Sequence, residues 1–106
     1  MHSPFVNKIV AFDQNTASTF AVVAAPTNGK RIRITGYELI SAGSNTIVFK
    51  DGTTALSGAM PLIAGARLAV APDEKPAFET RANTAFNVTL SAAVQVAGYF
   101  TYQLVD

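Results

Sequence analysis

The side chains that could support catalysis are few and scattered along the 106 residues. The single histidine, His2, lies near the N-terminus, where chains commonly fray. Histidine is the usual proton shuttle near neutral pH, so a serine-type triad would depend on this one residue, and no GxSxG pattern accompanies it. The absence of cysteine removes thiol nucleophiles and thiolate metal sites. These residues predict that the chain is not an enzyme.

Carboxylates are the remaining candidates, because a glycosidase needs two of them facing each other about 5–10 Å apart. Glu38 lies in an expected strand, and Glu79 stands in the run FETR. We expect both to be outward strand residues that pair with a neighbouring Arg or Lys. The segments DQN and DGT do not continue into a twelve-residue calcium loop, and both GxGxxG and the P-loop pattern are absent. We therefore expect no metal and no cofactor.

The charge balance limits the classes of partner. Eight Lys and Arg face seven Asp and Glu, and charged residues make up 14% of the chain, against about 25% in an average soluble domain. A formal charge of +1 provides little attraction to phosphate backbones or anionic lipid, and no stretch approaches the ~20 apolar residues of a membrane helix. We expect neither a nucleic-acid nor a membrane partner. The start MHSPFVN lacks the pattern of a secretory signal, so we expect synthesis in a cytoplasm without export.

The hydrophobic periodicity is that of β-strands. Phe86, Val88 and Leu90 alternate with polar or small neighbours, and the same alternation runs over residues 94–104. The alanines are interleaved with Thr, Val, Gly and aromatic residues, which gives no capped helical pattern. Further strands are expected over the ranges 8–13, 16–24, 67–71 and 78–81.

Two local signals refine this pattern. In the run KRIRITGYELISAG the apolar phase begins at Ile32 and, after Gly36, moves by one residue to Tyr37, which predicts a β-bulge. The dipeptide Asp51-Gly52 predicts a tight hairpin turn. About eight short strands at spacings near ten residues indicate an all-β fold, an antiparallel β-sandwich or jelly roll. Residues 1–7 are expected to form an N-terminal arm, and residues 8–106 a single β-sandwich domain.

A chain that is 49% hydrophobic has difficulty burying all its apolar surface in one small domain, so we expect self-association. Phe5 and Val6 in the arm could reach onto a neighbouring subunit. Arg31 and Arg33 point outward on one strand and could form inter-subunit or cross-strand ion pairs. Tyr99 lies opposite to the inward residues of its strand, where it could cover a subunit contact. These residues are the candidate interface: Phe5, Val6, Arg31, Arg33 and Tyr99.

The run GTTALSGAMPLIAGARL and the later run FETRANTAFNVTLSAAVQVAGYFTYQLV together resemble small virion proteins of tailed bacteriophages. This resemblance implies a virion structural protein on the capsid surface, namely a decoration (cement) protein that bridges subunits of the major capsid protein as a homotrimer or homodimer. The alternative is a tail or fibre module that binds a receptor or carbohydrate, with Tyr99 or Tyr37 stacking on sugar. The shared pattern consists of turns and strands and carries no catalytic residue.

Overall fold

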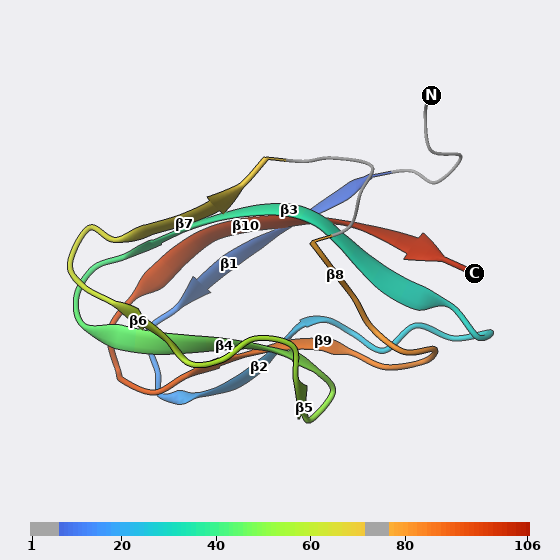
Figure 1. The fold of residues 1–106 in the computed structure, drawn as a ribbon, viewed down its shortest axis with the longest axis horizontal. Coiled ribbons are helices and arrows are strands. Elements are labelled where there is room, and N and C mark those ends of the chain that lie inside the picture. The colour runs from blue at the N-terminus through green and yellow to red at the C-terminus, as the bar shows by residue number, and fades with distance from the viewer. Residues whose placement is uncertain (1–6, 72–76) are drawn as a thin grey trace.

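The computed structural model describes residues 7–71 and 77–106. These residues form ten strands in two antiparallel sheets that lie face to face (Figure 1), and they include no helix. The expected all-β antiparallel sandwich is therefore confirmed. Within this part of the chain there is no helix of the length and apolarity that a membrane crossing requires. The arm residues Phe5 and Val6 lie outside the described residues.

Each sheet contains five strands. Sheet A consists of β1 (Lys8–Gln14), β10 (Val96–Val105), β3 (Arg31–Ser41), β7 (Arg67–Val70) and β8 (Phe78–Glu79), the last two both paired with β3. Sheet B consists of β2 (Ser18–Val23), β9 (Phe86–Leu90), β4 (Asn45–Asp51), β5 (Thr54–Ala55) and β6 (Met60–Leu62), the last two both paired with β4.

The strand order is that of a jelly roll. β1 pairs with β10, β2 with β9, β3 with β7 and β8, and β4 with β5 and β6, as if one long hairpin had been rolled up. Two further pairings, β10 with β3 and β9 with β4, complete the two sheets. If β5 and β6 are counted as one strand, and β7 and β8 as another, the ten strands occupy the eight positions of this fold. The sequence pattern predicted about eight strands, with β7 and β8 as separate strands over 67–71 and 78–81, but it did not show the short strands β5 and β6.

Both local signals in the sequence correspond to observed structure. Opposite β10, Thr101 pairs with Gly36 while Tyr102 pairs with Ile34, so β3 carries one extra residue at the expected bulge. The hairpin between β4 and β5 turns at Gly52, whose φ of 60° favours glycine. The bulge changes the phase of β3, and the hairpin brings β5 beside β4.

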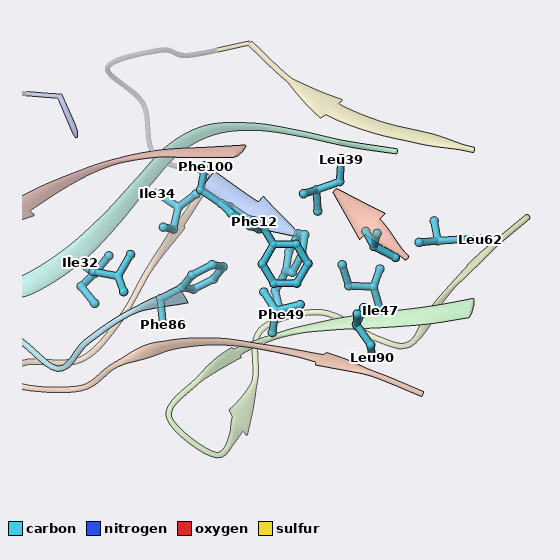
Figure 2. Packing of buried hydrophobic residues seen from close by; sticks show 13 residues of the cluster. Phe12, Ile32, Ile34, Leu39, Ile47, Phe49, Leu62, Phe86, Leu90 and Phe100 are labelled. Carbon is cyan, nitrogen blue, oxygen red and sulfur yellow. The ribbon is translucent and has the colours of Figure 1, made fainter. Parts of the chain in front are cut away.

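The core fills the space between the sheets. Phe100 of sheet A packs against Phe49 and Phe86 of sheet B, with ring centroids 5.7 and 5.2 Å apart (Figure 2). Edge-to-face contacts of this kind add to the burial of large apolar rings. Thirteen buried residues form the cluster: Phe12, Val23, Ile32, Ile34, Leu39, Ile47, Phe49, Leu62, Phe86, Val88, Leu90, Val96 and Phe100.

One buried polar residue, Asn45 at the start of β4, forms side-chain hydrogen bonds with the turn between β9 and β10. Its amide nitrogen donates to the carbonyl oxygens of Ala92 and Val94, at 3.1 and 3.0 Å. Its amide oxygen accepts from the backbone N–H groups of Thr46, Ser91 and Ala92. Because both the nitrogen and the oxygen of the amide are hydrogen-bonded, burial of the Asn45 side chain leaves neither atom without a partner. Asn45 therefore ties the turn to sheet B.

Candidate functional site

The surface of sheet A that faces away from the core is the candidate site. Residues paired in register share a face of a sheet, and Phe12, Phe100 and Leu39 face inward. Their neighbours along β1, β10, β3 and β7 therefore face outward. We call this surface the outer face; it is formed by Ile9, Ala11, Asp13, Ala97, Tyr99, Thr101, Gly36, Glu38, Ile40, Arg67 and Ala69.

Tyr99 occupies the middle of the outer face. In its row, Ala11 of β1 and Glu38 of β3 flank it, and Ala69 of β7 follows Glu38. The sequence-based placement of Tyr99 on the opposite face to Phe100 is confirmed.

Two isoleucines make the outer face apolar. Ile9 is 69% exposed and Ile40 is 50% exposed. In the described residues only Ile63, in the loop after β6, and Val70 of β7 are comparably exposed large hydrophobic residues. Strand residues exposed to water on a sheet surface are usually polar, so two exposed isoleucines on one face favour a contact with another protein surface.

Two of the three charges of the outer face form an ion pair within it. Glu38 of β3 forms an ion pair with Arg67 on the adjacent strand β7. Asp13, at the end of β1, accepts a hydrogen bond from the side chain of Gln95 at 2.9 Å. The expected role of Glu38 as the cross-strand partner of an arginine is therefore confirmed. The outer face offers no cluster of positive charge that could attract phosphate.

Arg31 and Arg33 lie on the same side of sheet A as the outer face, farther along β3. Both contact Glu79 of β8, with nitrogen–oxygen distances of 3.1 Å in each pair. Arg31 also donates to the backbone oxygen of Asp106 at 3.2 Å. Of the two expected roles, the structure shows the cross-strand ion pairs, and an inter-subunit role stays a prediction. Tyr99 and the two arginines share one side of the sheet, but no contact joins them directly.

The two glutamates do not form a catalytic pair. Glu79 lies opposite Arg33, five residues along β3 from Glu38, which is roughly 16 Å at the rise of an extended strand. Carboxylates of glycosidases are at most about 10 Å apart. In residues 7–71 and 77–106 no three His, Cys, Asp or Glu side chains gather as a metal site would require.

Tyr37, the other candidate for stacking on sugar, faces the opposite side of sheet A from Tyr99. Its ring packs edge-to-face on Phe49, with centroids 5.2 Å apart, and stacks on Phe78 at 6.3 Å. Burial raises the pKa of its hydroxyl above the ordinary value. Since the two tyrosines lie on opposite faces, they form no common platform for a sugar ring.

The edges of the sheets differ in how well they are protected against pairing with another chain. Unpaired N–H and C=O groups of an edge strand are a template for a further strand, and short strands, bulges and proline block it. In the described part of the chain, β7, β8 and β5 are short, β6 contains Pro61, and β2 has a register shift between Ala21 and Val23. β1 is seven residues long, contains no proline and pairs with β10 without a register shift. Among the described residues, β1 is thus an edge that neither a bulge nor a proline protects, and we call it the open edge.

Sequence reasoning identified Tyr99 but missed Ile9 and Ile40. The signal for Ile9 was present, because it alternates with Val10 and Phe12 in the run KIVAF and must face away from them. The signal for Ile40 was present too, because the apolar phase after the expected bulge begins at Tyr37 and therefore places Leu39 toward the core and Ile40 on the opposite face.

Comparison with known proteins gives a match of the fold alone. No family model matches the chain, and no curated protein matches it. A solved structure with a similar fold belongs to Bacillus endospore appendages, which are described as a novel family of disulfide-linked pili. The TM-score is 0.57 and the identity 18%, and the match covers 95% of this chain and 87% of that one. At this identity the chain is shown to share the β-sandwich architecture of a pilus protein.

Proposed function

We propose that this chain is a non-enzymatic structural subunit that associates non-covalently with further copies of itself. The observation that carries the proposal is the open edge of β1, seven residues long and without the bulge or proline that blunts other edges. The exposed isoleucines of the adjoining outer face support it, since they add apolar surface beside that edge. The shared fold with a protein of disulfide-linked pili is consistent with such a role.

The contacts between copies are non-covalent because the chain contains no cysteine. An assembly of this chain cannot use the disulfide links after which the similar pili are described. With a formal charge of only +1, long-range repulsion between copies is small, and burial of apolar surface dominates. Assembly is therefore expected to persist in reducing agent and at raised ionic strength.

The specific form that we propose for this role is decoration of a bacteriophage head. It rests on the resemblance of the runs LSGAMPL and FETRANTAFNVTL to small phage virion proteins. In this proposal the subunit lies on the capsid surface, bridges neighbouring copies of the major capsid protein, and strengthens the shell through many weak contacts. A tail or fibre module is the alternative location for the same subunit.

The test of self-association is sedimentation of the purified chain over a wide concentration range, compared with the variant Ala11→Lys. Ala11 is an exposed residue of the open edge strand, and lysine there is a common protection of edge strands. The matched control is Ala55→Lys, an exposed position on the two-residue strand β5. We expect Ala11→Lys to lower the degree of association and Ala55→Lys to retain it. A wild-type chain that sediments as a monomer at every concentration would overturn the proposal.

The phage location has its own test, which is an electron-microscopy map of particles from cells that produce the chain. Density for the sandwich on the shell, and loss of shell stability when the protein is released by heating, are the expected results. Density on a tail fibre would move the subunit to the alternative location, and its absence from phage particles would overturn both locations.

A further inference from the structure

The two exposed isoleucines of the outer face are placed symmetrically about Tyr99. Ile9 lies on β1 in the row of Thr101, one row from Tyr99 in one direction. Ile40 lies on β3 in the row of Ala97, one row from Tyr99 in the other direction. With strands ~4.8 Å apart and same-face residues ~6.7 Å apart, each isoleucine Cα is roughly 8 Å from that of Tyr99, on opposite sides.

We propose that the outer face of sheet A packs against the outer face of a second copy of this chain, about a two-fold axis near Tyr99. This inference rests on the proposed function and names the surface that the copies share. In a two-fold contact the same patch serves both partners, so a residue i that meets j is repeated as j meeting i. The placement of the isoleucines allows Ile9 of one copy to meet Ile40 of the other while the two Tyr99 rings lie near the axis.

The charges of the face favour a second copy over a highly charged partner. Glu38 is neutralised by Arg67 within the same face. Asp13 lies at its margin and is hydrogen-bonded to Gln95. A nucleic acid or an anionic membrane would need a surplus of positive charge, which this face lacks. With Glu38 paired to Arg67, the face keeps one uncompensated charge, that of Asp13 at its margin. The repulsion between two copies of such a face is small, and salt screens it further.

The shape of the face also suits a second copy. Two sheets pack face to face at about 10 Å when their twists match, and a second copy presents a sheet of the same twist. Three residues of the face are alanines, namely Ala11 and Ala97 next to Tyr99 and Ala69 beyond Glu38, and their small side chains allow an opposing sheet to approach.

The area predicts how strong this contact is. Four strands and three rows span roughly 14 by 13 Å between Cα positions, far below the ~800 Å² per partner of a standard stable interface. The face alone therefore gives a weak, concentration-dependent dimer. Weak contacts become effective when many copies are held together, as in a shell or a fibre.

The experiment uses two lysine variants of matched residues. Ile40→Lys changes the outer face on β3, two strands away from the open edge of β1, whereas Ile63→Lys changes an equally apolar, exposed residue outside this face. Both residues are at least half exposed, so both variants should fold, as thermal unfolding would verify. In sedimentation experiments we expect Ile40→Lys to lose at least tenfold in dimer association constant and Ile63→Lys to match the wild type.

Chemical cross-linking is a second test, which shows whether Tyr99 lies near the proposed two-fold axis. Because the chain has no cysteine, a single Tyr99→Cys substitution gives one thiol per copy. A short bismaleimide should then link two copies at the about 10 Å spacing of packed sheets, and Ile63→Cys should give no such product. If the wild type associates but association persists in Ile40→Lys, or Tyr99→Cys does not cross-link, the face contact is refuted and the proposed function stands. A strictly monomeric wild type would refute both.

Discussion

Replacing Asn45 by alanine tests whether the turn between β9 and β10 depends on one buried amide. For three backbone groups, namely Ala92 N–H, Ala92 C=O and Val94 C=O, the structure shows Asn45 as the partner. The N–H groups of Thr46 and Ser91 have second acceptors, Ser91 Oγ and the Thr46 carbonyl, so they keep a hydrogen bond.

The expected cost follows from this count. At about 1 kcal/mol for each lost hydrogen bond to a buried group, three groups amount to about 3 kcal/mol of unfolding free energy. For a domain of this size, that corresponds to a melting temperature roughly 12–20 °C lower. Urea unfolding followed by circular dichroism should show the loss as a lower midpoint with an unchanged slope.

The matched control is Asn15→Ala, because Asn15 is an exposed residue between β1 and β2. A change at such a surface position is expected to stay within about 0.5 kcal/mol. The reasoning would be refuted if Asn45→Ala lost no more stability than Asn15→Ala, since water would then replace the amide at no cost.

Four further predictions concern the strands, the loops and the arm. Gly98→Ala should lower stability by about 1–3 kcal/mol or more, since a Cβ would lie 1.8 Å from a carbonyl oxygen of β3; an unchanged melting temperature would contradict this. Asp51→Ala should cost about 1–3 kcal/mol by removing the buried carboxylate that accepts from Arg81 Nε at 2.8 Å, and urea midpoints equal to those of the wild type would exclude it. Because burial raises the pKa of Tyr37 above about 10, its contribution to stability is present below that pH and is lost as pH rises through the folded-state pKa; ultraviolet titration should show a late phase that Tyr37→Phe lacks. Removing residues 1–7 should weaken assembly and leave the fold intact, and unaltered sedimentation of the truncated chain would count against an exchanged arm.

Much of the fold was predictable because a strand shows in the sequence as an alternation of apolar and polar residues over a few consecutive positions. The alternation at Phe86, Val88 and Leu90 depends only on neighbouring residues, and these three side chains are buried as expected. The turn at Gly52 and the bulge in β3 were visible for the same reason, since each is set by a few consecutive residues. The separate strands β7 and β8 were also expected, over the ranges 67–71 and 78–81, whereas the short strands β5 and β6 were not.

The candidate site was only partly predictable. Tyr99 was placed correctly by strand periodicity. Ion pairs were expected for Glu79, Arg31 and Arg33 as charged residues on strands, but only the structure shows that they pair with one another. The neighbours of Tyr99 on the outer face could not be known, because Ala11 and Glu38 are far from it in sequence and meet it only through strand pairing. Asn45 was missed because a buried amide and an exposed one look alike in a sequence.

The sequence by itself determined that the chain is built of antiparallel strands, where it turns, and that it carries little charge. These properties arise from each residue and its near neighbours, so they can be inferred before any strand has a partner. The tertiary structure decided that the first strand joins the last, which edge is left open, and which isoleucines remain in contact with water. Those features depend on pairings between distant segments, whose relative stability is a property of the whole packed sandwich.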